Sequence, residues 1–323
     1  MKKSLVLLAS GLLLITGCQK SGTPDEEMMA DEQVLATQRH CASAEVLEEQ
    51  MKADPALRQR MAEIEEFTQR VAANPGQFRL VNGMIEIPVV FNVLYRTTAE
   101  NVSLAQLQSQ IDVLNEDYSA TNADYNLTST YNTVKSGDVG IRFVLDAVNR
   151  KKTNKTSWST NDAMKKSASG IAPTSPTTKL NIWVCNMGGG ILGYAQFPGG
   201  SSATDGVVLD NNATGRTGTA AAPFNKGRTA THEVGHWLNL RHIWGDATCG
   251  NDQVGDTPLH NTANYGCPAA GHKSTCTGTP VEMTMNYMDY TDDACMYMFS
   301  AGQKSRMLAT FASGGPRNSF AQP

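Results

Sequence analysis

The chain has 323 residues, 40% of them hydrophobic, which is enough to form the core of one or two domains. Its formal net charge of -4 excludes the strongly basic surface of a nucleic-acid-binding protein. No apolar run reaches the roughly 18 residues that a membrane-spanning helix requires, so we expect no transmembrane helix.

The first residues have the composition of an export signal. Lys2 and Lys3 precede the apolar stretch SLVLLASGLLLI, which ends in the sequence ITGC. This ending resembles a bacterial lipobox, in which residues 1–17 are removed and Cys18 becomes the lipidated first residue. A plain secretory signal explains the apolar run but not the cysteine. We expect an exported lipoprotein of the bacterial cell envelope, in a compartment where disulfides form.

A helical segment is predicted behind a polar, acidic and lipidated tether of residues 18–32. Apolar side chains recur there at the spacing of one helix face: Leu57, Met61, Ile64 and Val71. The sequence NPG then ends the pattern. We therefore predict a helical segment over residues 33–78.

A change in charge separates this segment from the rest of the chain. Residues 19–78 contain 12 acidic and 6 basic side chains, whereas residues 79–323 contain 19 of each. The change coincides with the NPG sequence, which is typical of a loop. We predict a domain boundary near residues 74–80 and a single domain after it.

The pattern after the boundary is that of an α/β (α+β) domain. MIEIPVVFNVLY, VGIRFVLDAV, KLNIWVC, GGILGYAQFPG and DGVVLD predict strands, and LAQLQSQIDVLNEDYSA predicts an amphipathic helix after the first of them. A second helix is predicted from about Arg228. A third begins at Ser300, where Gln303 completes a capping box. Between these two helices the chain is rich in Gly, Asp, Cys and Pro and shows little periodicity.

The stretch HEVGHWLNLRH, from His232 to His242, has the spacing of a zinc site. On a helix, His232 and His236 lie one turn apart on the same face, so both imidazoles reach one metal ion. Glu233 points about 100° away, which suits a base acting on water at the metal better than a ligand.

His242 can join the two histidines only if the helix ends before it. Six residues at 3.6 per turn place it about 240° from His236 on a continuous helix. The turn needs a positive φ, and Asn239 stands where this motif usually has glycine. Asparagine adopts the left-handed conformation more readily than other non-glycine residues, at a cost of about 1 kcal/mol. We expect the three-histidine site to survive.

The sequences HEVGHWLNLRHIWGD and MNYMDYTDDACMYMF resemble those of the pappalysin family of metzincin zinc proteases, close to its small, ulilysin-like bacterial members. The resemblance covers about residues 84–310. It implies a catalytic domain with a twisted mixed sheet, divided by a cleft, with the active-site helix in its upper half. It also implies a Met-turn below the metal, with Met288 as the supporting methionine. Tyr290 would lie near the zinc and stabilise the transition state.

The implied reaction is hydrolysis of a peptide bond by an endopeptidase. Three neutral imidazoles leave one zinc position for water, whose pKa zinc lowers toward about 7. Glu233 accepts the proton as the water attacks and then passes it to the leaving amine. Family members bind substrate antiparallel to a strand at the cleft rim, and GGILGYAQFPG is the candidate strand.

The same relatives imply a preference for arginine or lysine directly after the scissile bond. Asp292 and Asp293 are the candidates for the carboxylate of that pocket, and an aliphatic pocket is the alternative. Two other functions stay open: a non-catalytic zinc-binding surface lipoprotein, which the intact Glu233 argues against, and a peptidase limited to small peptides. We expect a monomer that acts on protein or peptide substrates.

Of the seven cysteines, four cluster in the irregular stretch that most needs covalent links: Cys249, Cys267, Cys276 and Cys295. Four cysteines allow three pairings. The family resemblance favours Cys249–Cys276 with Cys267–Cys295. A structural zinc site is the alternative, although no CxxC pair exists. Cys185, at the end of the strand NIWVC, is expected to be a buried free thiol.

The loop CGNDQVGDTP is a candidate calcium site, because oxygen ligands on a loop suit Ca²⁺. The family resemblance implies calcium here, bound by Asp252, the carbonyl oxygen of Val254 and Thr257, with Asp256 as a further candidate. The alternative is a pair of solvated loop aspartates.

Cys41, in QRHCASAE, is a lone cysteine ahead of a metalloprotease domain. Its thiolate is a candidate for the fourth zinc position, where it would displace the water and keep the enzyme latent as a zymogen. A free thiol or a disulfide with Cys185 are the alternatives. His40 is a competing ligand, although a thiolate binds zinc better.

One cut is expected to activate the enzyme and release it from the membrane, since Cys18 and Cys41 both precede the boundary. A protease specific for basic residues would make that cut itself, at Gln69-Arg70 or Phe78-Arg79.

Overall fold

The computed structural model describes residues 35–73, 84–128 and 130–321. The predicted signal, lipobox and tether lie outside the described residues, as does the boundary expected near residues 74–80. Leu35–Pro323 form one compact unit. Among the described helices, none combines the length and the apolar character needed to cross a bilayer.

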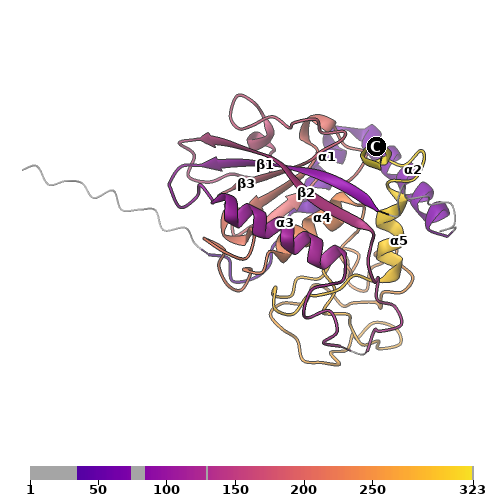
Figure 1. The fold of residues 1–323 in the computed structure, drawn as a ribbon. Helices are drawn as coiled ribbons and strands as arrows, with labels where there is room; N and C mark the ends of the chain where they lie inside the picture. The colour runs from indigo at the N-terminus through magenta and orange to yellow at the C-terminus, as the bar shows by residue number, and fades with distance from the viewer. Residues whose placement is uncertain (1–34, 74–83, 129, 322–323) are drawn as a thin grey trace, which may run out of the picture. The chain divides into compact units, whose positions relative to one another are not determined.

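A five-stranded sheet lies at the centre of this unit, as the strand patterns predicted (Figure 1). Its strands are β1 (Ile85–Tyr95), β2 (Ile141–Lys152), β3 (Leu180–Cys185), β4 (Gly193–Ala195) and β5 (Val207–Asp210), in the order β2-β1-β3-β5-β4. All neighbouring strands are parallel except β4, which runs antiparallel to β5. The sheet is therefore mixed, and the short strand β4 forms one of its edges.

The described residues also form five α-helices: α1 (Ser43–Ala53), α2 (Pro55–Ala72), α3 (Leu104–Tyr118), α4 (Arg228–Trp237) and α5 (Ala301–Ala309). Short 3₁₀ turns occur at Ala163–Lys165, Ser202–Thr204, Asn211–Ala213 and Asn318–Ala321. Helix α3 packs against β2 and α4, whereas α4 packs against β4 and β5. Helix α4, which carries the zinc motif, thus lies directly behind the edge strand.

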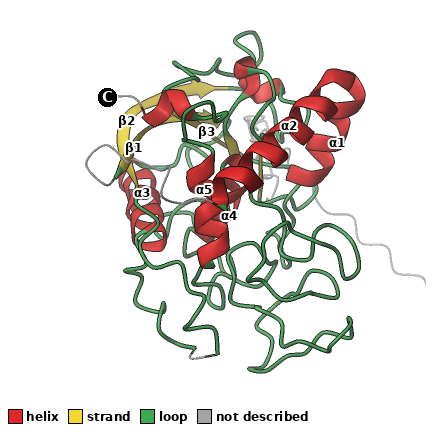
Figure 2. Cartoon of the chain, turned by 90° about the vertical axis from the view of Figure 1, so that its right-hand side faces the viewer, coloured by secondary structure: helices red, strands yellow, loops and turns green. Residues whose placement is uncertain are grey.

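The chain between α4 and α5 contains neither an α-helix nor a named strand, as its composition predicted. Figure 2 shows that loops make up the part of the molecule below α4. Two disulfides fasten them, and they are the predicted pairs Cys249–Cys276 and Cys267–Cys295. Helix α5 then begins with the predicted capping box. The side chain of Ser300 accepts a hydrogen bond from the backbone N–H of Gln303, and the side chain of Gln303 accepts one from the backbone N–H of Ser300.

The predicted helical segment ahead of the sheet contains the two helices α1 and α2. Asp54 ends α1 and caps α2 by accepting a hydrogen bond from the backbone N–H of Ala56, and Pro55 occupies the first position of α2. Leu57 and Val71, on the predicted apolar face, are buried. Helix α2 packs against α5.

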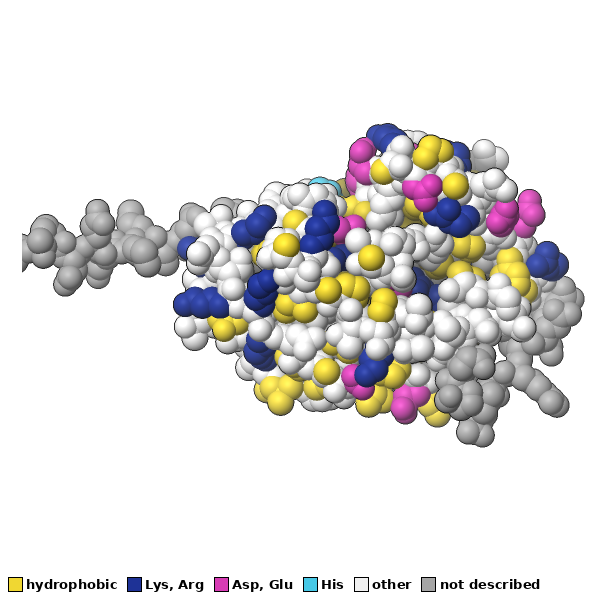
Figure 3. All heavy atoms as spheres, turned by 90° about the horizontal axis from the view of Figure 1, so that it is seen from above, with side chains coloured by type: hydrophobic (Ala, Val, Ile, Leu, Met, Phe, Trp, Pro, Cys, Tyr) yellow, Lys and Arg dark blue, Asp and Glu magenta, His cyan; other side chains and the backbone are white. Residues whose placement is uncertain are grey.

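Carboxylates mixed with lysine and arginine side chains are seen at the end of the molecule that carries α1 and α2 (Figure 3). Ion pairs in these helices, such as Lys52–Glu49 and Arg58–Glu48, are exposed. Exposed pairs of this kind contribute little to stability. Other contacts must therefore hold the two helices against the rest of the chain.

Candidate metal centre

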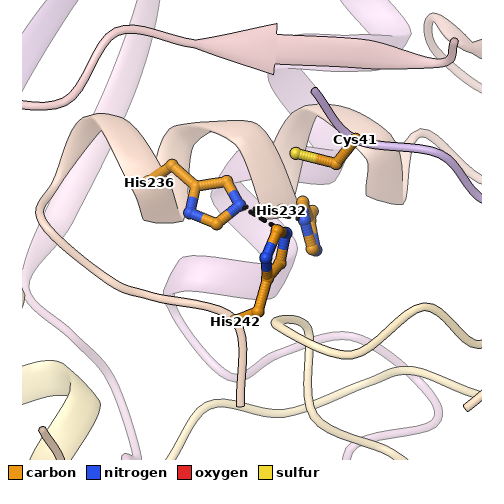
Figure 4. A group of neighbouring side chains, drawn as sticks. All are labelled: Cys41, His232, His236 and His242. Carbon is orange, nitrogen blue, oxygen red and sulfur yellow. Dashed lines mark hydrogen bonds between the residues drawn. The ribbon is translucent and has the colours of Figure 1, made fainter. Parts of the chain in front are cut away.

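Three histidine side chains converge below helix α4 (Figure 4). The Nε2 atom of His236 lies 3.1 Å from Nε2 of His232 and 3.1 Å from Nε2 of His242. All three side chains are at most 1% exposed. Tetrahedral zinc with bonds of about 2.0–2.1 Å requires nitrogen atoms roughly 3.3 Å apart, so the spacing matches a zinc site.

The hydrogen bonds of the other ring nitrogens fix the tautomers. Nδ1 of His232 and of His236 lie 2.6 Å and 2.8 Å from the carbonyl oxygens of Tyr287 and Leu240. A carbonyl only accepts, so Nδ1 carries the proton and the Nε2 lone pairs face one another. Burial, with His242 nearby, lowers the pKa of His236 to about 3, which keeps this ring neutral. Converging lone pairs without a proton call for a cation, and the donor set fits zinc.

Asn239 makes the turn that brings His242 back to the metal. Helix α4 ends at Trp237, and Asn239 has a φ of 71°, in the left-handed region expected from the motif. The turn closes through a hydrogen bond from the backbone N–H of Leu240 to the carbonyl oxygen of Gly235, 2.9 Å long. The side-chain amide of Asn239 is buried as well, and it donates to the hydroxyl of Thr68 in α2 at 3.1 Å.

Met288, the methionine expected in a Met-turn, packs against helix α4 at Gly235. Its side chain is fully buried, and a Cβ atom on Gly235 would come within 2.5 Å of its sulfur. Glycine inside the motif HEVGH therefore lets the helix approach the methionine closely. The backbone N–H of Ile243 also donates to the carbonyl oxygen of Met288, which ties the turn to the chain after the third histidine.

Glu233 points from α4 toward the edge strand. A Cβ atom on Gly193 would lie 3.0 Å from Cγ of Glu233, so the strand needs glycine there for the carboxylate to fit. Burial raises the pKa of Glu233 to about 7, while hydrogen bonds from Ser43 and Cys41 act in the opposite direction. Glu233, next to His232 in the sequence, can therefore both accept and release a proton near neutral pH.

Cys41 is the fourth member of the cluster. Its sulfur and the three histidine nitrogens all lie within 4.8 Å of one another, and Figure 4 shows it reaching the histidines from the N-terminal segment. Burial and the charge of Glu233 raise the pKa of the thiol well above its usual value. A bound zinc ion favours the thiolate instead. Cys185 is a separate buried free thiol, as predicted, so the alternative disulfide between the two does not form.

The segment around Cys41 pairs with the edge strand in parallel. Cys41 and Gly193 form a parallel bridge, in which Ala42 donates to the carbonyl oxygen of Gly193 and Leu192 to that of His40. The hydroxyl of Ser43 accepts from the backbone N–H of Ala195 and donates to Glu233, both at 2.8 Å. The N-terminal segment therefore pairs with the edge strand and also donates a hydrogen bond to the carboxylate of Glu233.

Arg39 fills a second buried position next to the cluster. Its guanidinium donates to Asp293 at 2.6 Å, and both side chains are at most 1% exposed. It also donates to the hydroxyl of Thr229 and to the carbonyl oxygen of Thr291. Asp293, one of the two carboxylates expected in a pocket for basic side chains, thus binds an arginine here, whereas Asp292 makes no such pair among the described contacts.

Tyr290 lies beside the histidines, with its ring centroid 4.9 Å from that of His242. Its hydroxyl donates to the carbonyl oxygen of Cys41 at 2.8 Å. The tyrosine is therefore within reach of the metal centre, and the N-terminal segment engages its hydroxyl.

The candidate calcium loop is folded around its own side chains. The hydroxyl of Thr257 donates to Asp252 and to the carbonyl oxygen of Val254, so three of the expected ligands lie together. Asp256 points elsewhere, because it accepts from the hydroxyl of Ser300 and from the backbone N–H of Gly302 at the start of α5. The calcium ligands stay a prediction, with Asp256 engaged in capping a helix.

Several residues of the site have no signal in the sequence. Arg39 precedes the candidate latency cysteine by two positions, but nothing in the local pattern links it to Asp293. Ser43, Gly193 and Asp246, which contacts Nδ1 of His242, are common residues that only the tertiary structure brings to the histidines.

Residues 176–312 match the peptidase M43 family, described as pregnancy-associated plasma protein-A. The chain is also similar to extracellular metalloprotease 1 of Coccidioides posadasii, with 33% identity over 260 residues, which cover 75% of this chain and 83% of the relative.

Two solved structures from Tannerella forsythia have a similar fold. Mature mirolysin in complex with a cleaved peptide has 43% sequence identity and a TM-score of 0.71, and the match covers 73% of this chain and 95% of that one. A promirolysin mutant has 40% identity and a TM-score of 0.79, and the match covers 87% of this chain and 97% of that one. The match to the proform extends over more of the present chain.

Substitutions at Asn239 test the turn. Asn239→Gly is expected to retain zinc at full stoichiometry, because glycine adopts positive φ readily, while it loses the hydrogen bond to Thr68. Asn239→Val is expected to lose most of the zinc, because a β-branched residue resists this conformation. The measurement is the zinc content of the purified variants by atomic absorption. A Val variant with wild-type zinc content would show that the turn does not depend on this residue.

Proposed function

Because the chain belongs to the peptidase M43 family and is a zinc metalloprotease, we propose that it is a secreted or surface-anchored endopeptidase made as a zymogen. The observation that carries the proposal is the cluster of three histidines closed by Cys41. Substrates are proteins or peptides, in keeping with the cleaved peptide bound to mature mirolysin. In the organisation we propose, residues 33–78 are the pro-segment and residues 79–323 the catalytic domain.

The proposed reaction uses the groups around the histidines. When bound, zinc acidifies water and polarises a carbonyl group as a Lewis acid. Glu233, with a pKa near 7, accepts the proton of the attacking water and then donates it to the leaving amine. Once the pro-segment has left, the hydroxyl of Tyr290 is free to donate to the developing oxyanion.

The pocket that holds Arg39 supports a preference for arginine or lysine after the scissile bond. Asp293 supplies the carboxylate, Phe224 lies under the guanidinium at 5.1 Å, and Thr229 adds an acceptor. A buried carboxylate accepts a basic side chain far more readily than an aliphatic one, since the aliphatic group leaves the charge unpaired.

Latency follows from the direction of the pro-segment. Its parallel pairing with β4 is opposite to the antiparallel pairing proposed for substrates, so no peptide bond is presented to Glu233 in the productive orientation. Ser43 further occupies the carboxylate of Glu233. We also propose that lipid on Cys18 tethers this zymogen to the membrane, and that calcium binds the loop at Asp252.

Activation by one cut would end latency and anchoring together. The bond Gln69-Arg70 lies inside α2, where a protease would first have to unfold the helix. We therefore favour Phe78-Arg79 as the site of cleavage.

Removing the general base tests the mechanism. Glu233→Ala is expected to bind zinc and fold normally, but to cleave unfolded casein at least about a thousand-fold more slowly, because no other group accepts the proton. The measurement is casein hydrolysis with and without a zinc chelator, and Glu116→Ala, in an exposed ion pair on α3, is the control. Near wild-type cleavage by the Glu233 variant would rule the mechanism out.

The pocket is tested with peptides that differ only after the scissile bond. We expect kcat/KM to be about a hundred-fold higher for arginine than for leucine, because only a cation pairs with Asp293. Asp293→Asn should abolish most of this difference, whereas Asp292→Asn is the matched control and should keep it. A wild-type enzyme that prefers leucine would contradict the proposed specificity.

The coupling of release to activation is tested by cell fractionation. The zymogen should be found with membranes and the processed enzyme in the medium. Cys41→Ala should speed the conversion, because the thiolate no longer closes the site. Glu233→Ala should block it unless another protease cuts. Processed, active enzyme that still carries lipid on Cys18 is the outcome that would overturn the coupling.

A further inference from the structure

Helix α2 of the pro-segment delivers a carboxylate to a buried arginine of α5. Both terminal nitrogens of Arg306 donate to the two carboxylate oxygens of Glu65, at 2.7 Å and 2.8 Å. The side chain of Arg306 is only 3% exposed and that of Glu65 is 18% exposed. This two-pronged contact is the geometry in which arginine recognises a carboxylate most specifically.

The other partners of Arg306 belong to the catalytic domain and hold the guanidinium in place. Its terminal nitrogens also donate to the carbonyl oxygens of Asn239, at 3.1 Å, and of Gln253, at 3.3 Å. Its Nε has no hydrogen-bond partner among the described residues. Cleavage of the pro-segment therefore removes the carboxylate but leaves the cation held by two backbone carbonyls.

Helix α2, which contacts Arg306, also contacts the chain that follows the edge strand β4. Beyond β4 the chain continues to Gly199, where Arg60 of α2 donates to the carbonyl oxygen and Ile64 packs against the glycine. A substrate antiparallel to β4 runs its residues before the scissile bond in this direction, away from the pocket that holds Arg39. Helix α2 thus covers the side of the cleft on which the N-terminal part of a substrate would lie.

We propose that in the processed enzyme Arg306 is a subsite for an acidic side chain of the substrate on the N-terminal side of the scissile bond. The proposal rests on the proposed function, because it uses the substrate direction set by the pocket at Asp293.

The choice of occupant follows from charge. Glu65 is the carboxylate that pairs with Arg306 among the described residues, and when it leaves, two backbone carbonyls still hold the guanidinium in place. A cation held in this way, without a negative charge beside it, attracts a new carboxylate. Asp252 is the nearby alternative within the domain, but its oxygens already accept from Thr257 and from the backbone N–H of Val254. The pro-segment would then mimic the charges of a substrate at two points, with Arg39 at Asp293 and Glu65 at Arg306.

The test uses fluorogenic peptides with arginine after the scissile bond and a single glutamate moved through the preceding positions. Matched peptides carry glutamine or lysine instead. With the processed wild-type enzyme, we expect glutamate at one position to raise kcat/KM about ten-fold over glutamine, mainly through a lower KM, and lysine to fall below glutamine. The advantage should shrink as salt is added.

Variants assign the effect to the arginine. Arg306→Gln is expected to remove the difference between glutamate and glutamine peptides, with zinc content measured in the same preparation. Arg142→Gln, in an exposed pair on the opposite edge strand β2, is the matched control and should keep the difference.

Equal kcat/KM for glutamate and glutamine at every position would overturn the subsite, as would an undiminished difference in zinc-loaded Arg306→Gln. If that variant fails to hold zinc, the peptide series on the wild-type enzyme decides by itself. Failure of the proposed function looks different, because then no peptide in the series is cleaved before its arginine.

Discussion

The left-handed turn at Asn239 is the constraint on which the site depends. Helix α4 can supply only two ligands from one face, and the third arrives because the chain reverses two residues after the helix ends. The same turn presents the carbonyl oxygen of Leu240 to His236 and that of Asn239 to Arg306. One backbone conformation therefore fixes the tautomer of His236, brings His242 to the other histidines and supplies an acceptor to Arg306 on α5.

The N-terminal segment, which we propose as the pro-segment, contacts the groups to which the proposed function assigns roles in binding and cleaving a substrate. It uses the free edge of the sheet, the carboxylate of Glu233, the hydroxyl of Tyr290 and the buried pocket of Asp293. Each contact is chemically ordinary, and their combination leaves none of these groups available. The exposed ion pairs of α1 and α2 add little, so the segment is held mainly by the buried contacts that its removal would open.

Much of the fold and the centre of the site could be predicted from the sequence, because they depend on local patterns. A few neighbouring residues are enough to recognise the alternation of a strand, the capping box at Ser300 and the spacing from His232 to His242. The apolar spacing of Leu57, Met61, Ile64 and Val71 likewise lies within one helix, α2. The contacts of Arg39 with Asp293, of Glu65 with Arg306 and of Gly193 with Glu233 could not be predicted. Their partners lie far away in the sequence, and no periodic pattern links them.

The two disulfides also link the stability of the site to the compartment that holds the protein. They fasten the long stretch without regular structure that leads from the third histidine to the methionine below the metal. A copy of the chain held in a reducing cytosol would lack these links, and the stretch would then depend on its buried side chains and hydrogen bonds alone. Export to an oxidising compartment would then stabilise this part of the site before any cut of the N-terminal segment takes place.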